Sequence, residues 1–162
     1  MKGKIGWMIV CCSTLLLHNC KQEEVNEDTV GFSGITKTNN LGVILSADTT
    51  DWKFNEGWKP QESGLFTSNF PTGCQPGFNY RFIGFPNPAK DVFTLSPSLP
   101  TSARIELRVV DQQFNKLLSM DSLRGPVMIR GSDWNVKGMV RVYYKLIDNN
   151  CEFRGHGDIL IE

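Results

Sequence analysis

The sequence carries no excess of either charge, because its 162 residues include 17 Lys and Arg against 17 Asp and Glu. Protein binding to nucleic acid depends largely on a positively charged surface, so this composition excludes electrostatic capture of DNA or RNA. Histidine is also scarce, with His18 and His156 the two residues in the chain. A structural zinc site needs four Cys or His ligands, and we expect neither a metal nor a cofactor.

The chain also lacks the short motifs of common enzyme chemistries. It has no glycine-rich phosphate loop and no serine in a Gly-x-Ser-x-Gly elbow. The remaining catalytic candidates are His156 with Asp158, which would share one face of a strand, and the acidic loop from Asp48 through Asp51 to Glu56. That loop offers oxygen ligands of the kind calcium takes but lacks EF-hand spacing. We predict a noncatalytic protein, with a secreted enzyme that uses one of these groups as the alternative.

No apolar run approaches the ~20 residues that a membrane-spanning helix needs. The longest one covers residues 5–17 (IGWMIVCCSTLLL), after a basic start at Met1–Lys4. A short basic segment followed by such a run is typical of a cleaved export signal. We therefore predict a signal peptide at 1–19, a flexible polar tether at 20–40 and a folded domain at 41–162.

The end of the apolar run, Leu17-His-Asn-Cys20, resembles the lipobox of bacterial lipoproteins, in which the cysteine becomes the acylated N-terminus. The following Lys21-Gln-Glu-Glu is similar to the acidic stretch after the lipid cysteine in surface-displayed lipoproteins of the Bacteroidota. The resemblance implies lipidation at Cys20 and attachment to the cell envelope, in the outer membrane, on its periplasmic or surface face. Two or three acyl chains hold a protein on a membrane permanently. The alternative is an ordinary secreted protein with an unmodified Cys20.

The five cysteines fall into two groups, three near the N-terminus and two in the body of the chain. Cys11 and Cys12 lie in the expected signal peptide and Cys20 is the expected lipid site, which leaves Cys74 and Cys151 in an exported, oxidising compartment. We predict a disulfide between these two residues, with two separate buried thiols as the alternative. In the chain-entropy model such a bridge stabilises the fold by roughly 4 kcal/mol.

Alternation of apolar and polar residues predicts β-strands throughout the body. It is clearest at 104–109, where Ile105, Leu107 and Val109 would face the core and the other face would meet water. The stretches 139–147 and 151–162 are expected to form a hairpin, because Asp148-Asn149-Asn150 tolerates the backbone of a tight turn. Weaker strand candidates are 41–47, 64–70, 78–84, 91–96, 116–120 and 126–130.

Eight or nine short strands separated by turn residues indicate an all-β fold, an antiparallel β-sandwich, with a closed barrel as the main alternative. No stretch of the body shows helical periodicity. Four prolines, Pro86, Pro88, Pro97 and Pro100, surround the strand at 91–96. Since proline cannot donate a hydrogen bond to a neighbouring strand, we expect this strand at a sheet edge.

The segment Phe85-Pro-Asn-Pro-Ala-Lys-Asp91, the strand after it and Arg104-Ile-Glu-Leu-Arg-Val-Val-Asp111 resemble the start of Ig-like C-terminal modules in secreted proteins of the Bacteroidota. The resemblance covers residues 84–147 and implies an Ig-like fold and a bacterial phylum. Those modules serve type IX sorting. We do not carry this role over, because the chain ends at Glu162 without their basic terminus.

Aromatic side chains are the candidate ligand-binding residues. Trp52, Phe54 and Trp58 lie in one polar segment (DWKFNEGW) and Trp134 lies in a second one (GSDWN). Such rings stack on sugars or anchor protein partners, and they also plug the open end of a small core. The sequence thus predicts an anchored, noncatalytic sandwich that binds an envelope protein or a glycan. A structural subunit of an envelope complex is a further alternative.

Overall fold

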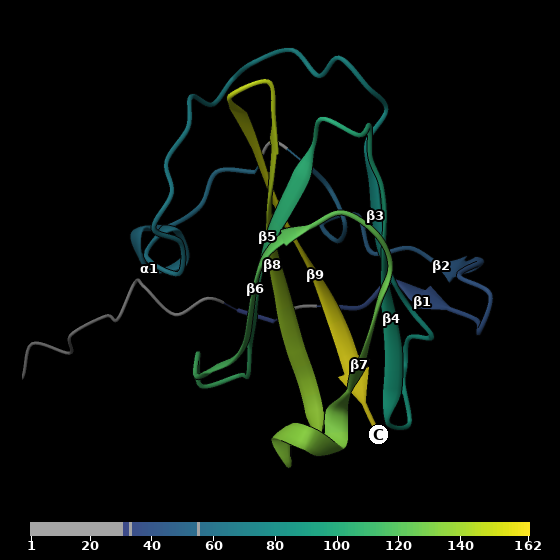
Figure 1. The fold of residues 1–162 in the computed structure, drawn as a ribbon. Helices are drawn as coiled ribbons and strands as arrows, with labels where there is room; N and C mark the ends of the chain where they lie inside the picture. Colours follow the sequence, from purple (N-terminus) through teal and green to yellow (C-terminus); the bar gives the residue numbers. More distant parts are fainter. Residues whose placement is uncertain (1–30, 33, 55) are drawn as a thin grey trace, which may run out of the picture.

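The computed structural model describes residues 31–32, 34–54 and 56–162, so the expected signal peptide and Cys20 lie outside the described residues. Two antiparallel sheets form a β-sandwich, as predicted (Figure 1). One sheet has the order β3-β4-β7, with β3 at Arg81–Phe85, β4 at Val92–Ser98 and β7 at Val127–Arg130. The other has the order β6-β5-β8-β9, with strands at Lys116–Leu123, Arg104–Val110, Gly138–Asp148 and Cys151–Ile161.

The strand order is Ig-like. In constant-type immunoglobulin domains the first, second, fourth and fifth strands form one sheet, and the third, sixth and seventh form the other. Counted from β3, the chain follows this order, except that its fourth strand, β6, pairs with β5 and joins the second sheet. Outside the sandwich lie a small sheet of β1 (Lys37–Thr38) and β2 (Ile44–Ser46), the one-turn helix α1 (Pro60–Ser63) and the 3-10 turn η1 (Gly131–Trp134).

The core between the sheets is built by alternating residues, as the period-two pattern predicts. From β8 it takes Val140, Val142, Tyr144 and Leu146, which are all fully buried. The β8–β9 hairpin is confirmed, and its turn residues Asn149 and Asn150 have φ angles of 48° and 61°. Asparagine tolerates this left-handed backbone better than most residues, which explains why the chain reverses there.

The expectation that one face of the 104–109 strand meets water is wrong. Glu106 and Arg108, on the outer face of β5, are buried, and so are Arg141, Tyr143 and Lys145 on β8. The segment that precedes β3 covers this outer face and forms a second apolar cluster in which Phe66 and Trp58 pack against Tyr143 and Val110. The strands β5, β8 and β9 are therefore buried on both faces, whereas β6 stays partly exposed.

The predicted strand at 64–70 is also absent: this stretch follows α1 and crosses the outer face of the sheet without pairing. Its backbone groups bond to side chains of the sheet instead. Arg108 Nε donates to the carbonyl of Leu65 at 3.1 Å, and Lys145 donates to the carbonyl of Ser68. The amide of Phe70 donates to the Glu152 carboxylate at 3.0 Å. A segment whose backbone N–H and C=O groups are hydrogen-bonded in this way needs no neighbouring strand. Of the stretch 41–47, only Ile44–Ser46 forms a strand.

The strand at 91–96 is not at an edge, because β4 lies between β3 and β7. β4 pairs with β7 only as far as Leu95. Pro97 lies beyond that point and pairs with β3 alone, so the missing N–H of the proline interrupts no hydrogen bonds to β7.

The folded part also begins before residue 41, the expected domain boundary. Thr36 and Thr38 are buried, and the amide of Thr38 donates to the carbonyl of Asn87 at 2.8 Å.

Candidate functional site

The segment before α1 covers the free edge of β9. The amide of Trp52 donates to the carbonyl of His156 at 2.7 Å, and that of Glu56 to the carbonyl of Arg154 at 3.1 Å. The Asp158 amide donates to Asp51 Oδ1 at 3.1 Å. These bonds protect an edge that would otherwise be open to pairing. They also bring the two catalytic candidates together, because the acidic loop and the His156–Asp158 pair become neighbours.

Charged side chains at this edge pair with one another or accept hydrogen bonds from backbone amides. Arg141 donates from Nε and Nη2 to the two carboxylate oxygens of Asp158, each at 2.7 Å, and both residues are buried. His156 Nδ1 lies 2.6 Å from Glu56 Oε2. Asp51 Oδ2 accepts the Thr36 amide at 2.7 Å. Burial, together with the nearby Asp158 charge, raises the pKa of Asp51 to about 6.

Ligand atoms of Asp51, His156 and Asp158 lie within 4.8 Å of one another, which is close enough to hold a cation. However, Asp158 already pairs with Arg141 through both oxygens, and both oxygens of Asp51 accept backbone amides. A metal ion would have to displace these partners. In the described ranges no Ser or Thr hydroxyl bonds to the imidazole, whose partner is Glu56. The geometry therefore favours a structural ion-pair network over a catalytic triad or a metal site.

The aromatic candidates Trp52 and Phe54 point into the sandwich. Trp52 lies between the two sheets, parallel to Tyr144 with ring centroids 6.2 Å apart and edge-on to Phe82 at 5.7 Å. A Cβ at Gly157 would overlap the Trp52 indole, so this glycine leaves room for the ring. Phe54 packs edge-on against Tyr144 at 5.3 Å. Both rings plug the core, which was the alternative interpretation of the sequence.

Trp58 and Trp134 are half-buried and also pack against the body. Trp58 stacks on Phe66 at 5.0 Å on the outer face, with the Arg154 guanidinium 5.4 Å from its ring, and Trp134 lies edge-on to Phe93 at 6.1 Å. Within the described part of the chain, the buried indole N–H groups of Trp52 and Trp58 have no hydrogen-bond partner. Packing therefore holds these rings, and the four aromatic candidates do not form one exposed patch.

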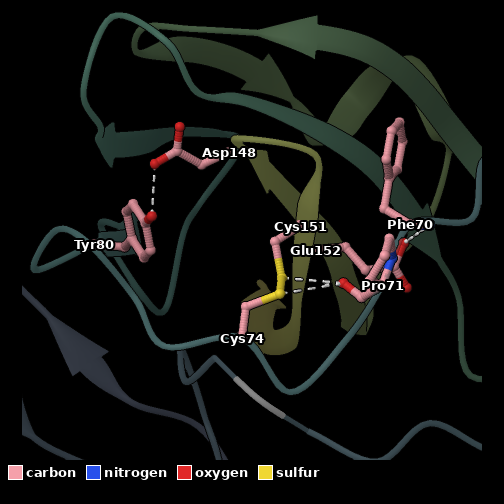
Figure 2. Close-up of a disulfide and its surroundings, with 7 residues drawn as sticks. All are labelled: Phe70, Pro71, Cys74, Tyr80, Asp148, Cys151 and Glu152. Atoms are coloured by element: carbon pink, nitrogen blue, oxygen red, sulfur yellow. Dashed lines mark hydrogen bonds between the residues drawn. A yellow bond between two sulfur atoms is a disulfide. The ribbon is translucent and has the colours of Figure 1, made fainter.

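The Cys74–Cys151 disulfide is present, with Cα atoms 6.4 Å apart (Figure 2). It joins the loop before β3 to the first residue of β9. Around it, the Glu152 amide donates to the carbonyl of Pro71 at 2.9 Å. The Tyr80 hydroxyl donates to Asp148 Oδ2 at 2.7 Å (Figure 2). Burial and the Asp148 carboxylate raise the pKa of Tyr80 to about 12. The loop is thus fixed at several points.

A polar groove of about 470 Å³ lies beside the disulfide. It lies between the 56–57 and 72–76 segments and the start of β9. We call it the polar groove, and its lining residues are Glu56, Gly57, Thr72, Gly73, Cys74, Gln75, Pro76, Glu152 and Arg154. Thr72 and Gln75 are exposed and face solvent with hydrogen-bonding groups. Such a surface suits a polar ligand. Sequence reasoning missed it because its residues are far apart in the chain.

Exposed large apolar side chains gather on the β1–β2 hairpin, at Leu41, Val43, Ile44 and Leu45. The sequence placed these residues in a body strand. A signal was available, because LGVIL shows no alternation with polar residues, whereas a half-buried strand would alternate.

No family model, curated protein or solved structure matches this chain. In the part that the structure describes, no helix is long and apolar enough to cross a membrane.

Proposed function

We propose that the chain is a cell-envelope lipoprotein of a Bacteroidota-type bacterium, anchored through Cys20, whose noncatalytic sandwich binds a glycan or another envelope protein. The observation that carries the proposal is the N-terminal sequence: a basic start, the apolar run 5–17 and Leu17-His-Asn-Cys20 in that order. Such an order is typical of export signals that end at a lipid-modified cysteine.

Two features of the folded part support this proposal. The Cys74–Cys151 disulfide suits an exported protein, because disulfides persist in oxidising compartments and are rare in the cytosol. The Ig-like strand order is the one implied by the resemblance of residues 84–147 to secreted modules of the Bacteroidota.

The hydrogen-bond partners of the titratable groups support the noncatalytic part of the proposal. A general acid or base needs a free position from which to exchange a proton with substrate. Both carboxylate oxygens of Asp158 are instead occupied by Arg141, and both of Asp51 by backbone amides. His156 pairs with Glu56 through Nδ1, and in the described ranges no Ser or Thr hydroxyl bonds to its ring. The network holds the covering segment on β9, which is a structural task.

For ligand binding, the polar groove is the best supported surface. It combines exposed hydroxyl and amide groups at Thr72 and Gln75 with the partly exposed guanidinium of Arg154, which pairs with the buried Glu152. Groups of this kind recognise the hydroxyls of a glycan, and the disulfide that borders them fixes the loop before any ligand arrives.

Anchoring is tested by comparing the native chain with Cys20→Ser in a Bacteroidota host, using intact mass and membrane partitioning. We expect the native protein to begin at Cys20, carry a diacylglyceryl and an acyl group and sediment with membranes, and the variant to lose the added mass and the membrane attachment. Cys11→Ser is the matched control, because that cysteine lies in the expected signal peptide and its loss should change neither property. A soluble, unacylated native chain would refute the anchor.

Ligand binding is tested on an array of envelope polysaccharides, with Thr72→Ala/Gln75→Ala against Gln61→Ala. Gln61 is an exposed amide on α1, outside the groove lining, so its loss controls for general surface change. We expect the groove variant to lose binding that the control keeps. Equal binding by both variants would exclude the groove as the glycan site.

A further inference from the structure

The β1–β2 hairpin presents an apolar tip that nothing in the described chain covers. Leu41 is 84% exposed, Leu45 67%, Val43 54% and Ile44 53%. Isolated exposed apolar residues are common, whereas four within five positions form a patch that marks a contact surface. We call residues 41–45 the apolar tip.

The tip is rigidly built. Asn39 Oδ1 accepts the amides of Leu41 and Val43 at 2.9 and 3.0 Å, and the amide of Gly42 donates to the Asn39 carbonyl at 3.1 Å. Consecutive amides 41, 42 and 43 are therefore all satisfied within the turn. Pairing of these donors lowers the cost at which the turn leaves water, because each unpaired amide would add to the cost of entering an apolar medium.

The base of the hairpin is fixed to the sandwich, so the tip has a defined direction. Thr38 and Asn87 exchange two backbone hydrogen bonds, and Gly42, at φ 76°, lies against the ring of Phe85. In Figure 1 the hairpin extends from the side of the molecule opposite α1. Contact with an external surface would therefore orient the whole domain.

Exposure on both sides of the ribbon indicates the kind of partner. Successive residues of a strand point to opposite faces, so Ile44 and Leu45 of β2 point to opposite sides of the ribbon, and Val43 lies in the turn before them. All three are exposed. A protein that packs on one face would leave the other in water, whereas the boundary between lipid headgroups and acyl chains surrounds an inserted tip on every side.

The charge of the hairpin and its distance from Cys20 also favour a lipid bilayer as the partner. Residues 29–47 contain no Asp or Glu, and Lys37 is their one charged residue, so nothing in this stretch is repelled by anionic headgroups. About 17 residues separate Lys37 from Cys20, and a stretch of that length spans at most about 60 Å. An anchor at Cys20 would keep the tip within reach of the same bilayer.

We infer that the apolar tip inserts into the headgroup–acyl boundary of the lipid bilayer and gives the domain a second, oriented attachment to the membrane. The inference rests on the proposed function only for the nearness of that membrane. Leu41, Val43, Ile44 and Leu45 supply the apolar contact, and Lys37 lies at the base where headgroup phosphates would be.

The test places a fluorescent reporter at the tip with Leu41→Trp and measures quenching by vesicles of phosphatidylethanolamine and phosphatidylglycerol with brominated acyl chains. The matched control is Met128→Trp, because Met128 is 76% exposed on β7, away from the hairpin. Emission of the native chain, which comes from its other tryptophans, is subtracted. We expect quenching and a blue shift for the reporter at 41 and neither change for the reporter at 128.

A second measurement uses the Cys20→Ser chain, which carries no lipid, in vesicle flotation. Leu41→Ser/Leu45→Ser should lower the vesicle partition constant about a hundredfold, since burial of each leucine is worth about 1.5 kcal/mol or more and 1.4 kcal/mol is a factor of ten. Met128→Ser should leave it unchanged. Thermal unfolding of each variant checks that these exposed substitutions keep the fold.

The outcomes separate the two proposals. If the acylated chain resides on vesicles and the reporter at 41 is not quenched, the tip inference fails and the lipid anchor stands. If Cys20 carries no lipid and the reporter is still quenched, the anchor fails and the tip inference stands. A self-association that Leu41→Ser/Leu45→Ser abolishes, without quenching, would show that a second copy covers the tip and would overturn the inference.

Discussion

Trp52 and Gly157 compete for the same space between the two sheets, so a double-mutant cycle tests whether Trp52 is a core residue. The indole packs against Tyr144 and Phe82, and a Cβ at Gly157 would overlap it. Trp52→Ala should leave a cavity, and Gly157→Ala should force the ring out of its place. The two effects are coupled, because the first substitution creates the space that the second one needs.

The expected magnitudes follow from the packing. Loss of a buried tryptophan ring typically lowers the free energy of unfolding by about 3–5 kcal/mol, and because Trp52 is partly exposed we expect about 3 kcal/mol. Gly157→Ala should cost about 3 kcal/mol while Trp52 is present, which is the upper range for overpacking. In the Trp52→Ala background the same methyl group enters the vacated space and should cost less than about 0.5 kcal/mol. The coupling energy is then about 3 kcal/mol in size, far above the deviation from additivity of about 0.5 kcal/mol that independent sites show.

Urea unfolding monitored by circular dichroism, with the disulfide intact, gives the four free energies of the cycle. Gly125→Ala is the matched control, because a Cβ there meets no atom within 4 Å and should change stability little. Additivity within about 0.5 kcal/mol would refute the reasoning. Trp52 would then not occupy the space beside Gly157, and its role as an exposed ligand-binding ring would return.

Three further predictions concern the network and the disulfide. Because the folded pKa of Asp51 is about 6 against an ordinary 3.8, the folded state keeps a proton that the unfolded state releases, so stability should fall by about 2 kcal/mol as pH rises from about 4 to 6. Urea unfolding across that range should show this slope in the native chain and a flatter one in Asp51→Asn; equal slopes would contradict the assignment. Tyr143→Phe removes the 2.8 Å hydrogen bond to the buried Glu62 and should cost about 1–2 kcal/mol in the same assay, whereas no loss would mean that the bond is absent in solution. Replacing both Cys74 and Cys151 by Ala opens a bridge of sequence separation 77 and should lower stability by about 4 kcal/mol, so a change below about 1 kcal/mol would indicate an unbridged native protein.

Local patterns predicted the strands whose neighbours in the chain are also their neighbours in space. The β8–β9 hairpin is the clearest case, because Val140, Val142 and Tyr144 alternate with polar residues and two asparagines mark the turn. The same alternation misled at the outer face of β5, where Glu106 and Arg108 suggested contact with water. These charges are buried because partners distant in the sequence bond to them, such as Ser68 with Glu106 at 2.5 Å.

The candidate site was predicted as two separate groups for the same reason. His156 and Asp158 belong to β9, and Asp51 and Glu56 belong to a loop about 100 residues earlier. Backbone pairing of that loop with the free edge of β9 brings them together, and no side-chain pattern encodes such pairing. The alternation of Trp52 and Phe54, which both point into the core, was the one sequence feature that could have indicated an edge segment.

The covering segment decides which surfaces remain for binding. Residues 51–70 occupy the outer face of the four-stranded sheet and the free edge of β9, two surfaces through which an open sandwich would meet partners. The exposed surfaces with binding chemistry, the polar groove and the apolar tip, are formed largely by the segments before β3. These segments precede the strands of the sandwich in the chain. The sandwich therefore supports these two surfaces, and the residues that form them lie largely in the N-terminal half of the chain.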